Sequence, residues 1–168
     1  MIVTQATAYG LQAACAALAV SAVAAGWSDA RHRRIPNWLC AATAIAGLAF
    51  AIWANGWHGA LGNALHFLIA LVAGMALFRM RVFGGGDAKY YAAVAAWFSL
   101  QQAVLLLLAV TLSGLVLLVI WFATRRLAGM PIRKTAGTGM DGLPYGIAIG
   151  AGAVITAASM IPSASQIV

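Results

Sequence analysis

The sequence predicts an all-α integral membrane protein in which six transmembrane helices leave both termini on the non-cytoplasmic side. Its composition, its apolar runs and the distribution of its basic residues carry this prediction. Of the 168 residues, 64% are hydrophobic and only 8% are charged, and the mean hydropathy is +0.93. Because a soluble domain has about 25% charged residues, this composition indicates a membrane protein. The length suits a single membrane-embedded domain over residues 1–168.

Six apolar runs follow one another, at about residues 9–27, 38–54, 61–78, 90–100, 103–122 and 144–161. Most of them approach the roughly 20 residues that a helix needs to cross a bilayer. The fourth run is too short, because its 11 residues form only about 16 Å of helix against a hydrocarbon core of about 30 Å. We therefore expect its helix to begin earlier, near Gly85. Asp87 would then lie in the first helical turn, where free N–H groups and the helix dipole favour a carboxylate.

The basic residues alternate with the apolar runs and orient them. All ten lie in three of the intervening segments, namely Arg31, Arg33 and Arg34, then Arg79, Arg81 and Lys89, then Arg125, Arg126, Arg133 and Lys134. By the positive-inside rule these segments are cytoplasmic, so both termini of a six-span chain lie outside. Their positions also suit contact with anionic lipids. Nucleic acid is not an expected partner, because the basic residues do not gather on one soluble face.

The chain has only three acidic residues, Asp29, Asp87 and Asp141, and no glutamate. A carboxylate near a bilayer core costs roughly 2.5–3.5 kcal/mol, so its presence needs a reason. Asp29 and Asp87 both lie at the predicted cytoplasmic face. Two such carboxylates in a low dielectric share a proton, so one can act as base toward water while the other donates to a scissile amide. Interfacial ion pairs, Asp29 with Arg31 or Arg33 and Asp87 with Lys89, are the alternative interpretation.

Other chemistries have little support in the sequence. A chain without glutamate cannot carry the H-E-x-x-H motif of zinc peptidases. Cys15 and Cys40 lie inside apolar runs without paired spacing, so neither a zinc site nor a disulfide is expected. We expect no metal and no organic cofactor. Residues 137–142 formally fit G-x-G-x-x-G, but they follow a transmembrane run rather than a strand, and Asp141 suits a turn or helix cap.

Three short motifs resemble those of one known family. Residues 29–37, Asp-Ala-Arg-His-Arg-Arg-Ile-Pro-Asn, resemble the D-x-x-x-x-x-I-P-N segment of type IV prepilin peptidases. Residues 84–89, Gly-Gly-Gly-Asp-Ala-Lys, resemble their G-G-G-D-x-K motif, and residues 143–146, Leu-Pro-Tyr-Gly, resemble their P-Y/F-G element. That family belongs to the G-x-G-D intramembrane aspartyl proteases. The order of the motifs and their placement relative to the apolar runs also agree with it.

The resemblance implies that Asp29 and Asp87 are the catalytic pair. It implies a supporting role for the other motif residues, which are Ile35, Pro36, Asn37, Gly84, Gly85, Gly86, Lys89, Pro144, Tyr145 and Gly146. The expected activity is removal of the short basic leader from prepilins or pseudopilins at the cytoplasmic face, by a multi-pass protein of the inner (cytoplasmic) membrane. Independently of the resemblance, Lys89 and Arg31 lie close to the aspartates in the sequence, so either is a candidate for holding the charge state of the pair.

The resemblance also bears on which members of the family are most similar. Longer, bifunctional members carry a soluble N-terminal extension with paired C-x-x-C zinc ligands, which this sequence lacks, so N-methyltransferase activity is not expected. A chain this short is more similar to the peptidases of tight-adherence (Flp-type) pili or to archaeal preflagellin peptidases. A non-catalytic transporter or secretion-assembly subunit is the alternative, but its ionisable groups would lie at mid-span rather than at one face. The sequence leaves the oligomeric state open.

Overall fold

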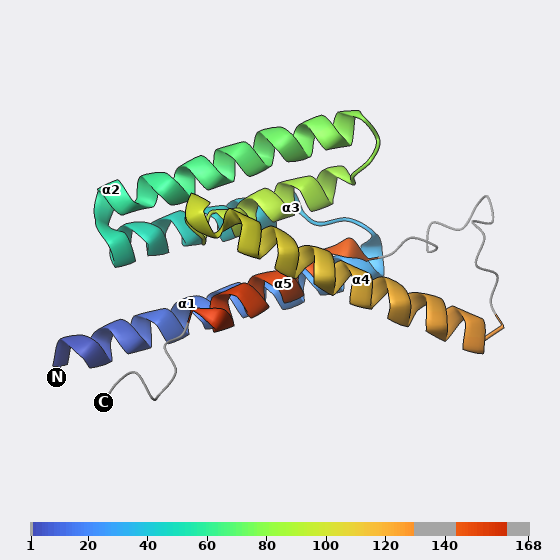
Figure 1. Ribbon diagram of the computed structural model, residues 1–168, viewed down its shortest axis with the longest axis horizontal. Helices are drawn as coiled ribbons and strands as arrows, with labels where there is room; N and C mark the ends of the chain where they lie inside the picture. Colours follow the sequence, from blue (N-terminus) through green and yellow to red (C-terminus); the bar gives the residue numbers. More distant parts are fainter. Residues whose placement is uncertain (1, 130–143, 161–168) are drawn as a thin grey trace.

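The protein is a bundle of helices (Figure 1), and the computed structural model describes residues 2–129 and 144–160. The helices are α1 (Ile2–His32), α2 (Asn37–Arg79), α3 (Gly85–Ala95), the 3-10 helix η1 (Leu100–Gln102), α4 (Ala103–Leu127) and α5 (Tyr145–Ser159). This part of the chain contains no β-strand, which confirms the all-α prediction. Three segments are long and apolar enough to cross a membrane, namely 9–32, 37–79 and 100–127, and α5 is a shorter apolar helix.

Helix α2 is a hairpin rather than one straight helix. Gly56 has non-helical angles, φ 68° and ψ −179°, at the point where the chain reverses. Positive φ is accessible to glycine at little steric cost because it has no Cβ. The two arms on either side run antiparallel (Figure 1), so the apolar runs predicted at 38–54 and 61–78 both lie within α2.

Helix α3 begins at Gly85, as the sequence predicted, but it ends at Ala95. Its 11 residues make about 16 Å of helix, so α3 alone is too short to cross a bilayer. Side chains of α2 bind the chain just beyond its end: Asn63 Nδ2 donates to the Ala96 carbonyl at 3.1 Å, and His66 Nδ1 lies 3.0 Å from the Phe98 carbonyl. These contacts give hydrogen-bond partners to backbone carbonyls beyond the end of the helix. Such carbonyls need partners from the protein where water is scarce.

The helices pack as two groups. Helix α3 lies against the α2 hairpin, whereas α5 packs between α1 and α4. Small residues allow the second group to pack closely, because a Cβ added at Gly150 would lie 2.8 Å from Ala22 Cβ, and one at Gly152 would lie 2.6 Å from Val110 Cα. The two groups meet where α3 contacts α5 and where α1 contacts α2. This seam is where the motif residues lie.

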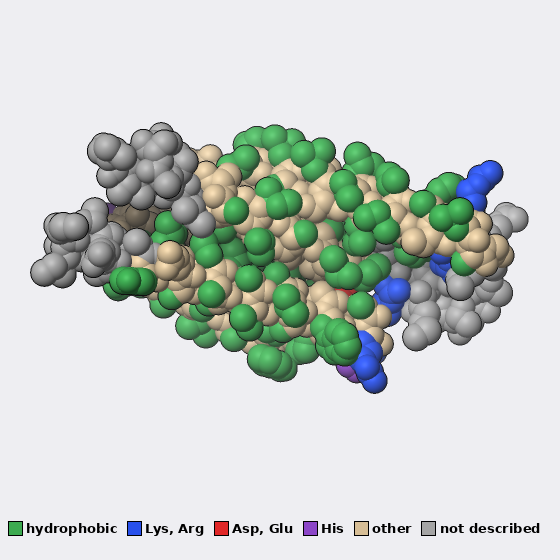
Figure 2. Space-filling view, turned by 90° about the horizontal axis from the view of Figure 1, so that it is seen from below, with side chains coloured by type: hydrophobic (Ala, Val, Ile, Leu, Met, Phe, Trp, Pro, Cys, Tyr) green, Lys and Arg blue, Asp and Glu red, His purple; other side chains and the backbone are tan. Residues whose placement is uncertain are grey.

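The outer surface of the described residues is largely apolar, whereas the basic side chains lie at one end (Figure 2). Leu108, Leu112 and Leu115 of α4, for example, are each more than half exposed. Such a surface suits contact with lipid rather than water. The basic end is also where α1 ends and where α3 begins (Figures 1 and 2). Sorting of the basic segments to one side of the protein, which the sequence predicted, therefore holds for the described residues.

Candidate active site

Asp29 lies in the last turn of α1 and is buried, with 8% of its surface exposed. Its Oδ2 accepts a hydrogen bond of 2.8 Å from the backbone N–H of Gly146, the second residue of α5. The first N–H groups of a helix have no partner within the helix and favour a carboxylate. A Cβ on Gly146 would lie 3.1 Å from both Asp29 Cβ and Ile35 Cδ1. The glycine therefore allows α5 to approach close enough to hold the Asp29 carboxylate.

Asp87 lies in the first turn of α3. Gly84 precedes this helix in an extended conformation, and its carbonyl accepts a 3.0 Å hydrogen bond from the Ala88 N–H. A Cβ added to Gly84 would lie only 2.5 Å from Asp87 Oδ2, so a side chain at position 84 would clash with this carboxylate. A Cβ on Gly85 would lie 3.1 Å from the Phe78 ring. The glycines before Asp87 therefore leave room for its carboxylate and for the end of α2.

The segments that carry the two aspartates meet at Ile35. A Cβ on Gly86 would have the Ile35 backbone nitrogen as its nearest neighbour, at 3.6 Å, and Ile35 Cδ1 lies against Gly146. Asp87 is outside the three long apolar helices. Burial, and after it the negative charge of Asp29, raises the pKa of Asp87 from 3.8 to about 6. The structure therefore brings Asp29 and Asp87, from different helices, into one electrostatically coupled site.

Lys89 and Arg31 contact groups other than these carboxylates. Lys89 Nζ donates a 3.1 Å hydrogen bond to Asn37 Oδ1, and the Arg31 guanidinium lies over the Trp27 ring, 5.8 Å from its centroid. Asn37 is the first residue of α2, directly after Pro36, and Lys89 follows Asp87 in α3. The Lys89–Asn37 bond thus links the ends of the two predicted motifs. The alternative in which Lys89 pairs with Asp87 is not the arrangement in the structure.

Several motif residues line a cavity of about 670 Å³ beside the aspartates. Its lining consists of Ser28, His32, Arg33, Arg34, Ile35, Pro36, Asn37, Gly86 and Lys89. The first two motifs, which are far apart in the sequence, therefore form one hollow at the basic end of the molecule.

Tyr145, the first residue of α5, lies against Phe83 on the other side of the site. Their rings meet edge to face with centroids 5.4 Å apart, and a Cβ on Gly114 would lie 3.0 Å from the Tyr145 hydroxyl oxygen. The sequence singled out Tyr145 through its motif, and Pro144 directly precedes the helix as expected. Phe83 was not predicted as a site residue. Its only signal is an aromatic side chain directly before three glycines.

Asp141 and Leu143 lie outside the described residues. Cys15 and Cys40 are free thiols, and within residues 2–129 and 144–160 no three His, Cys, Asp or Glu side chains gather as metal ligands.

Comparison with known protein families identifies the family of the chain. Residues 16–119, more than half of the chain, match the type IV leader peptidase family. The chain belongs to that family. The matched region contains Asp29 and Asp87 and ends before Tyr145. Neither the curated proteins nor the solved structures give a match. Family membership makes the protein a leader peptidase, with prepilins in general as the expected substrates.

Proposed function

We propose that the protein is an intramembrane aspartyl endopeptidase that removes the short basic leader of Flp-type prepilins at the cytoplasmic face of the inner membrane. The observation that carries this proposal is the meeting of Asp29 and Asp87, the only carboxylates in the described residues, at the basic end of an otherwise apolar bundle. Peptide hydrolysis by paired carboxylates needs no covalent intermediate and no metal. N-methyltransferase activity is not part of the proposal.

The contacts of the two aspartates suggest different roles. Asp29 Oδ2 accepts the Gly146 N–H, which fixes the orientation of the carboxylate, so we assign Asp29 as the base toward water. Burial and the nearby charge of Asp29 favour the protonated form of Asp87, so Asp87 is the acid that donates to the scissile amide. Charge sorting supports a topology of six membrane-embedded segments with both termini outside, in which α3 enters from the cytoplasmic face and α4 returns to it.

The function is tested by leader cleavage with purified components. The protein is placed in liposomes with a Flp-type prepilin, and the product is identified by mass spectrometry and N-terminal sequencing. A single cut between the basic leader and the apolar segment is expected. A type IV prepilin and an archaeal preflagellin, tested in parallel, separate the possible substrate classes. Intact prepilin in all three reactions would support the alternative of a non-catalytic transporter or assembly subunit.

The cleavage rate is expected to fall as pH rises through about 6. The raised pKa of Asp87 means that its proton, which the reaction requires, is lost above that pH. The raised pKa also makes the stability of the fold depend on pH. Protonated Asp87 stabilises the folded state fully below pH 3.8, the pKa of the carboxyl in the unfolded chain, and this stabilisation is lost as the pH rises through about 6. The measurement is kcat/KM between pH 5 and 8, with the apparent pKa assigned to the pair. A rate that rises to a plateau through this range would contradict the role given to Asp87.

The Lys89–Asn37 hydrogen bond is expected to position the two motifs relative to each other. Lys89→Met and Asn37→Leu should each slow cleavage, and the double variant should be little slower than either one, with a coupling energy of about 1 kcal/mol. The check is a double-mutant cycle on kcat/KM, with Lys89→Arg as the control that keeps a donor. Fully additive effects would show that the bond does not couple the motifs. A changed pH profile in Lys89→Met would show instead that Lys89 sets the charge state of the aspartate pair.

A further inference from the structure

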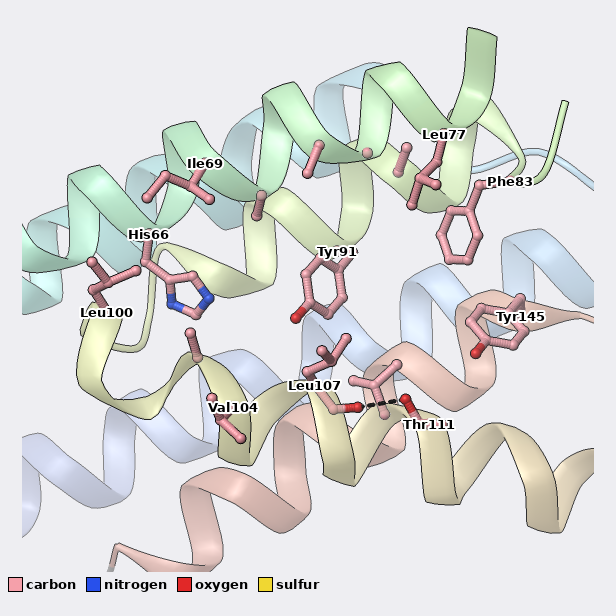
Figure 3. Close-up of a pocket in the computed structure, with 16 residues that line it drawn as sticks. His66, Ile69, Leu77, Phe83, Tyr91, Leu100, Val104, Leu107, Thr111 and Tyr145 are labelled. Atoms are coloured by element: carbon pink, nitrogen blue, oxygen red, sulfur yellow. Dashed lines mark hydrogen bonds between the residues drawn. The ribbon is translucent and has the colours of Figure 1, made fainter. Parts of the chain in front are cut away.

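A second cavity, of about 470 Å³, lies between the second arm of α2, helix α3 and helix α4 (Figure 3). Its volume is within the range of about 300–1,000 Å³ that is usual for ligand pockets. The walls are mostly apolar, with Ile69 and Leu77 on α2, Ala88 on α3, and Val104 and Leu107 on α4. We call this cavity the lateral cleft.

The lateral cleft exists because its two walls belong to different packing groups. Helix α2 packs on α3 and helix α4 packs on α5, so the second arm of α2 and helix α4 lie on opposite sides of α3. The inner surface is closed, since Ala88 and Val110 are almost fully buried. The rim is open, since Leu107 is 54% exposed and Val104 is 67% exposed. In a membrane, the cleft would therefore open sideways toward the lipid.

One end of the lateral cleft lies near the aspartates, although neither aspartate is part of its lining. Phe83 and Tyr145 line this end and contact each other (Figure 3). Phe83 is joined to Gly84, which lies against the Asp87 carboxylate, and Tyr145 is joined to Gly146, which binds Asp29. At the far end lie His66 and Leu100. From His66 to Leu77 the α2 wall is about 16 Å long at 1.5 Å per residue, which matches roughly three turns of a helix.

The polar groups in the lateral cleft indicate the kind of occupant. Tyr91 directs its hydroxyl into the cleft and His66 projects into its far end (Figure 3). Thr111 lines the opposite wall, where its hydroxyl donates to the Leu107 carbonyl at 2.7 Å. Polar side chains at membrane depth are costly and usually serve a function. His66 Nδ1 and the Thr111 hydroxyl already have partners within the protein, so the Tyr91 hydroxyl is the group that distinguishes the occupants. A lipid acyl chain offers it no hydrogen-bonding partner, whereas a polypeptide that leaves its helix beside the scissile bond offers free N–H and carbonyl groups.

We propose that the lateral cleft binds the apolar helix that adjoins the scissile bond of the polypeptide substrate. This inference rests on the proposed function, because it places the substrate relative to Asp29 and Asp87. The apolar walls bury the hydrophobic face of that helix, and the Phe83–Tyr145 end directs the adjoining peptide bond toward the carboxylates. The cleft is open on its lipid-facing side, so the substrate helix can enter it from the bilayer. The helix then approaches the aspartates without leaving the membrane.

Two neighbouring residues of α4 provide a matched test. Leu107 lines the lateral cleft and is 54% exposed, whereas Leu108 is 55% exposed and is not part of the lining. The probe is a synthetic peptide with a short basic leader, a scissile bond and a 20-residue apolar segment, compared with the same peptide cut to five apolar residues. Leu107→Trp should raise KM for the long peptide about tenfold and leave the short peptide unchanged, because the indole fills the cleft. Leu108→Trp should leave both peptides unchanged.

A cross-linking measurement keeps the test independent of folding and of catalysis. Cysteine at position 107 or 108, in an Asp87→Asn background that also lacks Cys15 and Cys40, carries a photo-cross-linker. Cross-linking of the long peptide from 107 and not from 108 is expected. Equal effects of the two Trp variants, equal cross-linking, or cross-linking from 107 to lipid alone would each overturn the proposal. Absence of cleavage by the wild-type protein would contradict the proposed function instead, and the cross-linking result would still judge the cleft.

Discussion

Replacing either Asp29 or Asp87 by asparagine is expected to slow leader cleavage by about 10³-fold or more, because each removes one partner of the acid–base pair. Asparagine keeps the shape of the side chain, and its amide oxygen can still accept the Gly146 N–H, so the fold should persist in both variants. The measurement is the initial rate of leader removal in liposomes. Asp29→Asn/Asp87→Asn should be no slower than the slower single variant, because the two residues act as a unit.

Asp141 provides the control for these variants, since it is the third and last acidic residue of the sequence. Asp141→Asn should cleave at close to the wild-type rate, which would show that loss of negative charge alone does not inactivate the protein. Membrane insertion and helical content, measured by circular dichroism, should be equal in the variants and the wild type, which excludes misfolding as the cause of a lower rate. If Asp29→Asn or Asp87→Asn kept more than about a tenth of the wild-type rate, the assignment of the pair would be wrong.

Adding a side chain at Gly146 is expected to slow cleavage by about 10- to 100-fold, although no catalytic group is removed. A Cβ at this position would come within 3.1 Å of both Asp29 Cβ and Ile35 Cδ1, so α5 or Asp29 must shift by a few tenths of an ångström. Such a shift lengthens the 2.8 Å bond that orients the Asp29 carboxylate. Small displacements of a catalytic group have large effects on rate because the reaction requires aligned atoms.

The test compares Gly146→Ala and Gly146→Leu with Gly62→Ala. At Gly62 the nearest neighbour of an added Cβ is Ser99 Cβ at an ordinary 3.8 Å, so this variant should be fully active. The loss at position 146 should lie in kcat more than in KM, with a larger loss for leucine, because Gly146 positions Asp29 rather than contacting the substrate. A wild-type kcat in Gly146→Leu would show that α5 does not orient Asp29.

Some features of the fold were predictable because they depend on local chemistry. The chain reverses at Gly56, between the apolar runs predicted at 38–54 and 61–78, and α3 begins at Gly85, within the glycine-rich segment. The end of α3 was not predictable in the same way. The apolar run continues to Leu100, but the helix stops at Ala95, where Asn63 and His66 from α2 bind the following carbonyls. Side chains distant in the sequence decide that boundary.

The sequence by itself determined that this is an apolar helical protein with its basic segments sorted to one side, and that Asp29 and Asp87 lie in segments resembling the motifs of the family that residues 16–119 match. Hydropathy, charge and motif spacing are properties of the chain, so no packing is needed to see them. The tertiary structure alone decided that Gly146 holds Asp29, that Lys89 binds Asn37, and that α2 and α4 leave a cleft between them. These depend on distances between helices, which follow from how closely small residues let the backbones approach.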